Sequence, residues 1–330
     1  MKRTINILVT GIGGNVGQGI LRNIQAYAKE NEQFMFRIVG LNVTPISAGN
    51  HLCDKTYEVE YAYDENYIPS IMSICKTEKI DVIFPSTDYE VYYLSKNAHK
   101  LPKMAVSPTE TNEVFLDKYK TWEFFSKYQI PFAHSYLPST YPENAFQSYI
   151  LKPKEGRGSR GIHINPKNIK DFSDDYMVQE LWTGKEITCA FYVTRQQKLH
   201  GFITFERELQ SGATAFCEVI QKYDSELEKI IQKMMLHLKI VGSCNIQAIV
   251  TKEGKIMPFE INGRISGTNS IRSQFGFKDI EYILEEYVFD KEPTVPKITK
   301  GSAIRILMDV IYPNSELKEP KNTQTDHFIY

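Results

Sequence analysis

The first forty residues constrain the fold most, because they combine a strand, a glycine turn, a helix and a second strand. The apolar runs at 5–10 and 37–41 predict two buried strands. Between them, the segment 11–17 (GIGGNVG) leads into a helix that is expected to end near Glu30. Such a unit opens a parallel sheet with helices on its faces. We therefore expect the chain to begin with a Rossmann-like α/β domain.

The same alternation continues through the first third of the chain. Strands are expected at 55–59, 80–85 and 104–106, and helices at 67–78 and 89–98. Asp88 and Glu90 follow the strand expected at 80–85, at the sheet edge where ligands gather in open α/β folds. Acids in that place more often cap the next helix, which is the interpretation we favour. Residues 1–112 are therefore expected to form one parallel α/β domain.

The glycine turn is similar to a dinucleotide-binding fingerprint, but two residues disagree with it. The strict pattern requires glycine at the position of Val16 and an acid at the end of the second strand, where the chain has Asn42. The glycines can instead allow the helix to pack closely on the strand. An NAD(P)-dependent oxidoreductase is therefore an alternative function, and we expect no dinucleotide to bind here.

Composition limits the classes of partner. The net charge of −1 gives no bulk attraction to nucleic acid or to membranes, and no stretch approaches the ~20 apolar residues of a membrane span. The N-terminal apolar run is too short for the core of a signal peptide. The five cysteines have no C-x-x-C spacing, which is typical of buried, reduced thiols. These features predict a cytoplasmic protein.

A glycine-rich loop with basic neighbours follows the apolar run 149–151 and Lys152. Three glycines and a serine are its candidate ligand contacts: Gly156, Gly158, Ser159 and Gly161. Successive backbone N–H groups in such a loop can form a concavity that binds anions. The loop is not a Walker loop, because Ile162 and His163 stand where Lys and Ser/Thr are required. It predicts either a flap over a polyphosphate or a basic hairpin turn in solvent.

A hairpin is expected to bring a carboxylate and three amides to one side of a sheet. Its strands are predicted at 245–250 and 255–262, with a turn at 251–254. Because side chains alternate along a strand, Glu260 and Asn262 share a face, opposite Gln247 and Asn245. Their oxygens suit Mg²⁺, although a solvent-facing polar stripe has the same pattern. Arg264, two residues later, suits a transferred phosphoryl group.

Taken in order, these segments resemble the ATP-grasp superfamily, and in particular single-copy proteins similar to one synthetase half of the carbamoyl-phosphate synthase large subunit. The carriers are 9–18 (VTGIGGNVGQ), 117–121 (DKYKT), 151–153 (LKP) with its glycine loop, 178–180 (VQE) with 184–186 (GKE), Gln247, and 260–264 (EINGR). The resemblance covers roughly residues 1–310. It departs from the family at Gly263, where Asn-Pro-Arg is common, and no second synthetase half or glutaminase is present.

The resemblance implies an α/β and α+β multidomain protein, with a Rossmann-like pre-ATP-grasp domain followed by a small lid and an antiparallel-sheet domain. The expected boundaries are 1–112 for the first domain, 113–183 for the lid, 184–312 for the C-terminal subdomain and 313–330 for a polar, poorly ordered tail.

The resemblance also implies a nucleotide site. Lys118 and Lys152 would hold ATP phosphates beneath the glycine flap, and Glu186 would bind the ribose hydroxyls. The adenine would lie against four successive residues, partly through their backbone: Gln179, Glu180, Leu181 and Trp182.

Three side chains would form the metal site. Glu260 and Asn262 would bind Mg²⁺, with Gln247 beside them and Mn²⁺ as an alternative ion. Arg264, together with Lys152, would act in catalysis by stabilising an acyl phosphate.

The implied function is that of an ATP-dependent carboxylate–amine ligase, or carboxylate–thiol ligase, which forms an acylphosphate and releases ADP and phosphate. The alternatives are the oxidoreductase and a nucleotide-binding protein without turnover. The expected partners are a small carboxylate and an amine, with no nucleic acid and no membrane, and the chain is compatible with a homodimer. Arg207, Arg272 and Arg305 are candidate carboxylate contacts, because a carboxylate suits the planar Arg fork, but each could equally be a surface or structural residue.

Overall fold

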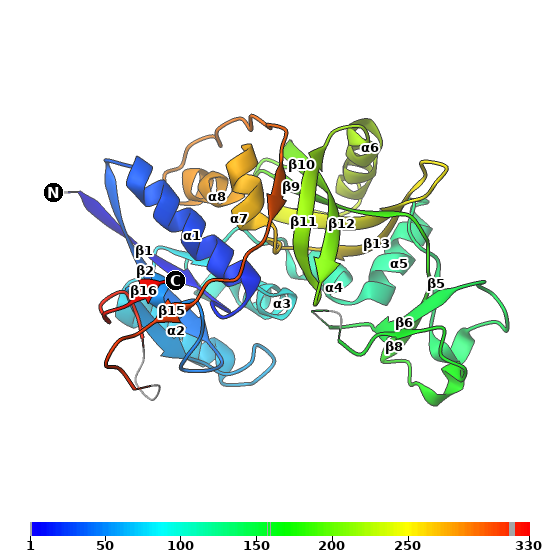
Figure 1. The fold of residues 1–330 in the computed structure, drawn as a ribbon, viewed down its shortest axis with the longest axis horizontal. Coiled ribbons are helices and arrows are strands. Elements are labelled where there is room, and N and C mark those ends of the chain that lie inside the picture. The colour runs from blue at the N-terminus through cyan, green and yellow to red at the C-terminus, as the bar shows by residue number, and fades with distance from the viewer. Residues whose placement is uncertain (1, 157, 159, 317–320) are drawn as a thin grey trace.

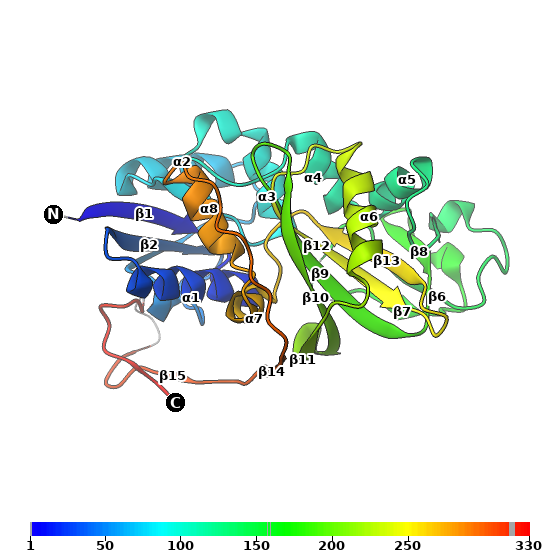
Figure 2. The same cartoon turned by 90° about the horizontal axis from the view of Figure 1, so that it is seen from above.

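The computed structural model describes residues 2–156, 158, 160–316 and 321–330. Three larger sheets follow one another along the molecule in Figure 1, with the parallel N-terminal sheet at one end and a small lid sheet at the other. A six-stranded antiparallel sheet lies between them, and the view in Figure 2 shows the same order. The predicted multidomain α/β and α+β class is confirmed.

The N-terminal sheet is parallel and has the order β3-β2-β1-β4. Its strands are β1 (Arg3–Val9), β2 (Phe34–Asn42), β3 (Lys55–Glu58) and β4 (Val82–Phe84). Its helices are α1 (Asn15–Glu30), α2 (Tyr67–Glu78), α3 (Asp88–Lys96) and α4 (Thr109–Leu116), with the 3-10 turns η1 (Asn50–Leu52) and η2 (Ala98–Lys100). The prediction of a strand at 104–106 is wrong: these residues form no strand, and only the preceding Lys103 forms an isolated parallel bridge, with Val82.

Alternating side chains of β1 divide the core of this domain into two layers. Ile5, Ile7 and Val9 pack on one side with residues of α1, and Leu8 packs on the other with residues of α2. The first layer continues into the six-stranded sheet through Phe205 and its neighbours. The N-terminal domain and the six-stranded sheet therefore share one hydrophobic core, which holds their facing edges in place.

The glycines of the N-terminal turn serve close packing. A Cβ on Gly17 would lie 2.5 Å from the carbonyl oxygen of Gly11, and Gly11 itself has a φ of +56°. The first helix thus approaches the end of β1 too closely for any side chain at Gly17. This supports the packing interpretation of the turn.

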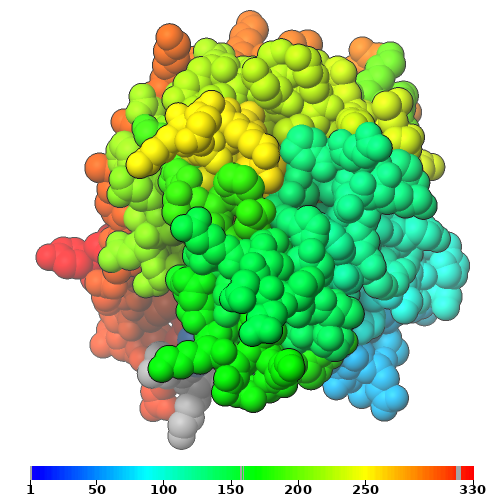
Figure 3. All heavy atoms as spheres, turned by 90° about the vertical axis from the view of Figure 1, so that its right-hand side faces the viewer, coloured from blue at the N-terminus to red at the C-terminus, as the bar shows by residue number. Residues whose placement is uncertain are grey.

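The lid follows α4. It contains α5 (Lys118–Lys127) and an antiparallel sheet of order β5-β8-β6-β7, with β5 (Ser135–Tyr136), β6 (Tyr149–Pro153), β7 (His163–Ile164) and β8 (Tyr176–Glu180) and the turns η3 (Pro138–Thr140) and η4 (Ile169–Asp171). Asp117 caps α5 by accepting hydrogen bonds from the backbone of Tyr119 and Lys120, so the helix starts at Lys118. In Figure 3 the lid fills the centre of this end of the molecule, with the hairpin turn near residue 250 against it.

The six-stranded sheet has the order β13-β12-β9-β10-β11-β14 and is antiparallel. Its strands are β9 (Lys185–Val193), β10 (Leu199–Gln210), β11 (Ala213–Ile220), β12 (Gly242–Val250), β13 (Ile256–Asn262) and β14 (Ser302–Ile304). The helices are α6 (Asp224–Met235), α7 (Asn269–Arg272) and α8 (Asp279–Tyr287), with η5 (Ser273–Phe275). Gln247 stands opposite Glu260 and Asn245 opposite Asn262, so the register predicted for the hairpin is confirmed.

The C-terminal segment departs from the expected poorly ordered tail in the part that the structure describes. Strands β15 (Val310–Ile311) and β16 (Phe328–Ile329) pair, and the backbone N–H of Thr323 donates to the carbonyl of Cys53 at 2.9 Å. Both contacts are made by backbone groups, and the polar amino-acid composition of the segment does not predict them. The five cysteines are buried and free, as predicted, and no helix in the described residues could cross a bilayer.

Candidate active site

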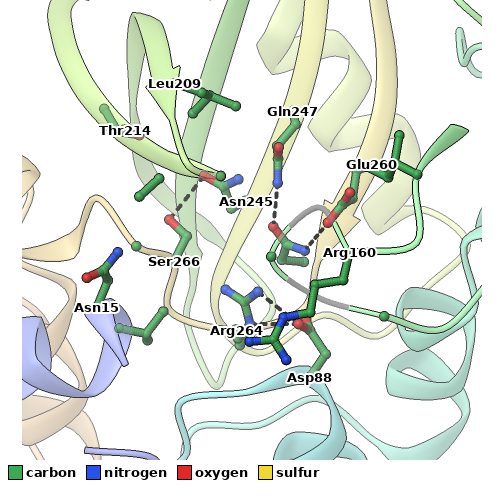
Figure 4. Close-up of a pocket in the computed structure, with 18 of the residues that line it drawn as sticks. Asn15, Asp88, Arg160, Leu209, Thr214, Asn245, Gln247, Glu260, Arg264 and Ser266 are labelled. Carbon is green, nitrogen blue, oxygen red and sulfur yellow. Dashed lines mark hydrogen bonds and ion pairs between the residues drawn. The ribbon is translucent and has the colours of Figure 1, made fainter. Parts of the chain in front are cut away.

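A cavity of about 240 Å³ lies where the lid, the six-stranded sheet and the N-terminal domain meet. Its lining includes eight predicted site residues: Lys118, Lys152, Gly156, Gly158, Gln247, Glu260, Asn262 and Arg264. Figure 4 shows Gln247 and Glu260 on adjacent strands on one side of this cavity, and the paired Arg264 and Asp88 on another. Residues as far apart in the chain as Asp88 and Arg264, which are separated by 176 positions, therefore converge on one space.

The predicted metal ligands form one hydrogen-bonded chain. Gln247 Nε2 donates to Asn262 Oδ1 at 3.0 Å, and Asn262 Nδ2 donates to Glu260 Oε1 at 3.0 Å. At the other end, Arg207 Nη2 donates to Gln247 Oε1 at 2.7 Å and to Glu186 Oε1 at 2.6 Å. The chain orients both amides, so that one carboxylate and two amide oxygens lie within reach of each other.

Two buried lysines flank this carboxylate. Lys118 Nζ donates to the carbonyl of Gly156 at 3.0 Å, which joins the start of α5 to the flap. Lys152 Nζ lies 3.3 Å from the carbonyl oxygen of Phe259. Burial raises the pKa of Glu260, but Lys118 and Lys152, together with the hydrogen bond from Asn262 and the charge of Arg264, outweigh it and hold that pKa below its ordinary value. Glu260 is therefore ionised at neutral pH.

Phe259 corrects one expectation from strand alternation. The register of β12 and β13 shifts between Gln247 and Ala248, which leaves Phe259 as the extra residue of a bulge. Its ring lies 5.6 Å from Lys152 Nζ and is only half-buried. Phe259 therefore lies beside Lys152 and not in the core, where regular alternation would place its side chain.

Arg264 is held by an acid of the N-terminal domain. Its Nε donates to Asp88 Oδ2 at 2.9 Å, and its Nη2 lies 2.8 Å from the same oxygen. The capping interpretation is right for Glu90, which forms a capping box with Thr87 at the start of α3. Asp88 also lies in the first turn of α3, and its carboxylate in addition pairs with Arg264 across the domain boundary.

Some of the flap residues line the cavity, and others pack against the base of the flap. Gly156 and Gly158 line the cavity, together with Arg160, which sequence reasoning did not select. A Cβ on Gly161 would lie 3.1 Å from the Pro153 side chain, so this glycine packs on the flap's own base. Ser159 lies outside the described residues.

The residues predicted for adenine and ribose do not line this cavity. Gln179 is buried, with its Nε2 donating to Ser135 Oγ at 3.4 Å. Glu180, Leu181 and Trp182 follow at the end of β8. The carboxylate of Glu186 pairs with Arg207, so contact with a ribose would require that ion pair to open. The roles of these five residues in nucleotide binding stay predictions.

Two of the three arginines predicted as carboxylate contacts lie at the cavity. Arg207 and Arg305 line it, and Arg305 donates to the backbone carbonyls of Thr214 and Gly267. The prediction that Arg272 contacts a substrate carboxylate is wrong, because its side chain is fully buried in an ion pair with Asp279. No local pattern in the sequence separates these three cases, since partner and burial are properties of the fold.

A second cavity, of about 710 Å³, adjoins the first. It lies beyond the carboxyl ends of the parallel strands, where the turns after β1 and β4 meet. These strands are neighbours whose connections run to opposite sides, and such a switch point is where open α/β sheets bind ligands. Asp88, Arg160 and Arg264 line both cavities, so a molecule in one can reach a molecule in the other.

Nucleotide binding is expected to take up a proton above pH 8. Burial, with help from Lys118, lowers the pKa of Lys152 from 10.5 to about 8, against the opposing charge of Glu260. The free protein thus loses this proton as the pH rises through about 8, and a bound phosphate would restore it. ADP affinity should therefore fall by up to about tenfold per pH unit between about pH 8 and 10.

Calorimetry at pH 9 in two buffers of different ionisation enthalpy measures this uptake. Lys152→Arg is the matched control, because a guanidinium stays charged throughout this range. Equal proton uptake by the variant and the wild type would show that another group titrates.

No dinucleotide is expected to bind at the N-terminal turn. Gly13 lies against Asn42, whose Nδ2 donates to Thr44 Oγ1, and no acid takes the ribose-binding place at the end of β2. Titration with NADH and NADPH, followed by fluorescence, should show no saturable binding. Tight binding that Gly13→Val removes would overturn this prediction and favour the oxidoreductase.

Comparison with known proteins adds two domain matches. Residues 7–109 match the family described as PylC-like, N-terminal domain, and residues 115–268 match the ATP-grasp domain. No curated protein matches the chain.

Solved structures agree in fold at low sequence identity. The chain is 13% identical to N5-carboxyaminoimidazole synthetase from Staphylococcus aureus complexed with ADP, covering 92% of this chain and 81% of that one, with a TM-score of 0.70. The ADP complex of the N5-carboxyaminoimidazole ribonucleotide synthetase purK is 13% identical, with 99% and 92% covered and a TM-score of 0.71. Biotin carboxylase from Campylobacter jejuni is 14% identical, with 90% and 74% covered and a TM-score of 0.68.

Proposed function

This chain belongs to the ATP-grasp superfamily, and from that premise we propose that it is an ATP-dependent ligase that joins a carboxylate to an amine. The observation that supports the proposal is the convergence on one cavity of two buried lysines, a carboxylate with two amides, and Arg264. Each group matches a charge that develops when a carboxylate takes a phosphoryl group from ATP. The amine as nucleophile, with a thiol as the alternative, is part of this proposal.

The donor set fits a hard divalent cation. No group of three or more His, Cys, Asp or Glu side chains in the described residues could hold a metal ion, and the candidate ligands are Glu260, Asn262 and Gln247. Mg²⁺ favours one or two protein carboxylates and completes its shell with phosphate oxygens and water. When bound, the cation would neutralise charge on the transferred phosphoryl group, and Mn²⁺ suits the same oxygens.

In this proposal Lys118 and Lys152, beneath the flap, bind the phosphates of ATP. Attack of a substrate carboxylate oxygen on the γ-phosphorus then breaks the bond to the β,γ-bridging oxygen and releases ADP. The resulting acylphosphate carries negative charge that Arg264 can stabilise, while Asp88 holds this guanidinium in place. Attack of an amine nitrogen on the acyl carbon breaks the C–O bond to phosphate, and the amine loses a proton. Positioning and charge neutralisation supply catalysis without a side-chain nucleophile.

Release of ADP in the presence of MgATP and pools of carboxylates, amines and thiols tests the proposal. We expect ADP only in pools that contain both a carboxylate and a nucleophile, and loss of ADP binding in Lys152→Ala. Glu58→Gln, an exposed change on β3 at a residue that lines neither cavity, is the control. ADP binding without ADP release from any pool would instead support a nucleotide-binding protein that lacks turnover.

The remaining partners are also part of the proposal. We infer small-molecule substrates, no nucleic acid and no membrane, with a homodimer as the assembly to test by light scattering. The reduced, buried cysteines support a cytoplasmic location.

A further inference from the structure

The second cavity has an end that the proposed chemistry does not use. The chain leaves β3 and forms one wall with the segment 59–63, at the carboxyl edge of the parallel sheet. Glu60, Tyr61 and Tyr63 of this segment all line the cavity. Arg264, where the acylphosphate would form, lies in another part of the lining and also reaches the first cavity.

Two tyrosines present flat faces at this end. Tyr61 and Tyr63 stack with ring centroids 5.4 Å apart and planes only 3° from parallel, and they are 48% and 60% exposed. The ring of Tyr89 meets Tyr63 nearly edge-on, at 6.1 Å and 75°. A stacked aromatic pair this exposed leaves apolar area in water, and the negative face of each ring attracts cations.

Glu60 adds a negative charge to the same end. Three acids line the cavity, but Asp88 pairs with Arg264, and Glu90 accepts hydrogen bonds from the backbone of Thr87. Glu60 is half-buried, accepts a hydrogen bond from Ser70 Oγ at 3.0 Å, and has no cationic partner among the described residues. A carboxylate so placed favours a positive ligand group, since its own charge is not neutralised within the described structure.

The cavity is thus polarised. Its acidic and aromatic end is formed by Glu60, Tyr61 and Tyr63, and arginines 160 and 264 form the part of its lining that is shared with the first cavity. A molecule that fills it with its reacting group beside Arg264 would place its other end against the tyrosines. At about 710 Å³ the space suits a ligand with two separated functional groups.

We propose that the substrate of the second cavity carries an organic cation, such as a protonated amine, at the end remote from its reacting group, and that Glu60 and an outer face of the stack formed by Tyr61 and Tyr63 bind this cation. That the ligand is a substrate rests on the proposed ligase function. The cation site itself depends only on the arrangement of these three side chains.

Three probes of equal length and different charge test the site: 1-aminopentane, 1-pentanol and pentanoate. Their binding to the full chain is measured by ligand-observed NMR, with MgADP present and absent. The wild type should bind the amine about tenfold more tightly than the alcohol. Glu60→Gln should abolish this preference, and Glu60→Lys should favour pentanoate instead. Tyr61→Phe should keep the preference and Tyr61→Ala should weaken it.

Glu58→Gln is the matched control, because it removes a nearby acid of β3 that does not line the cavity. An amine preference that is absent from the wild type, or that survives Glu60→Gln, would overturn the proposal. Failure of the ligase function is a separate result: MgADP would then fail to bind, or no pool would release ADP, while the charge preference of the probes remained.

Discussion

Glu260→Gln is expected to lower ATP-dependent turnover by roughly 10²–10³-fold or more, the range seen when one preorganised electrostatic group is removed. Glu260 is the one carboxylate of the candidate metal set, and its Oε1 already accepts a hydrogen bond from Asn262. Glutamine keeps the shape and removes the charge, so Mg²⁺ loses its only anionic protein ligand. Lys118 and Lys152 lose their shared counter-charge at the same time, and the pKa of Lys152 should fall further below its ordinary value.

The stability of this variant should also decrease. From the sequence, Glu260 is expected to be unpaired before a metal binds, which predicts little change in stability. The structure contradicts that premise, because two lysines lie close enough to hold the pKa of Glu260 down. We therefore expect a loss of roughly 1–3 kcal/mol, the usual scale for a hydrogen-bonded charge.

Ile261→Ala is the matched control for this experiment. Ile261 is the next residue of β13, but its side chain is buried in the core that packs under α6. Truncation should cost about 2–5 kcal/mol of stability and leave turnover of the folded fraction near wild type. ADP release and melting temperature are measured for both variants. Wild-type turnover of Glu260→Gln at saturating Mg²⁺ would place the metal site elsewhere.

Arg272→Met is expected to destabilise the protein by about 3–5 kcal/mol, because it leaves a buried acid without its partner. Arg272 and Asp279 are both fully buried and form an ion pair, with Arg272 Nε 3.3 Å from Asp279 Oδ1. Arg272 Nη1 also donates to Ser266 Oγ at 2.7 Å and to Thr268 Oγ1 at 3.1 Å. The pair thus braces the loop that follows Arg264 and lines the first cavity.

The double variant Arg272→Met, Asp279→Leu separates the ion pair from the loop contacts. Removing both charges should recover much of the stability, since no unpaired charge remains. Turnover should stay reduced, because Ser266 and Thr268 still lack their donor. Urea unfolding and ADP release are measured for the single and double variants. A double variant no more stable than Arg272→Met would show that the pair's charges are not the source of the loss.

Local patterns determined the elements that carry the site. The alternation of 245–250 against 255–262 predicts the hairpin, but the pairing of Gln247 with Glu260 also depends on the bulge at Phe259, because the register shifts between Gln247 and Ala248. The glycine turn after β1 and the flap after Lys152 can also be recognised from short segments. A positive φ and a close approach of the backbone to a neighbouring atom both require glycine at that position. These features involve neighbours in the chain or across one hairpin.

Only the tertiary structure decided which charges meet. Asp88 and Arg264 are 176 positions apart, and the sequence around Asp88 predicts its place in the first turn of α3 but not this pairing. Arg207, Arg272 and Arg305 look alike in sequence, yet one joins the amide chain, one is fully buried, and one lies against backbone carbonyls in the cavity. The lowered pKa of Lys152 likewise depends on burial by the six-stranded sheet and on Lys118 and Glu260. Coulomb energy and desolvation depend on distance in space and on the surrounding dielectric, and a linear pattern contains neither.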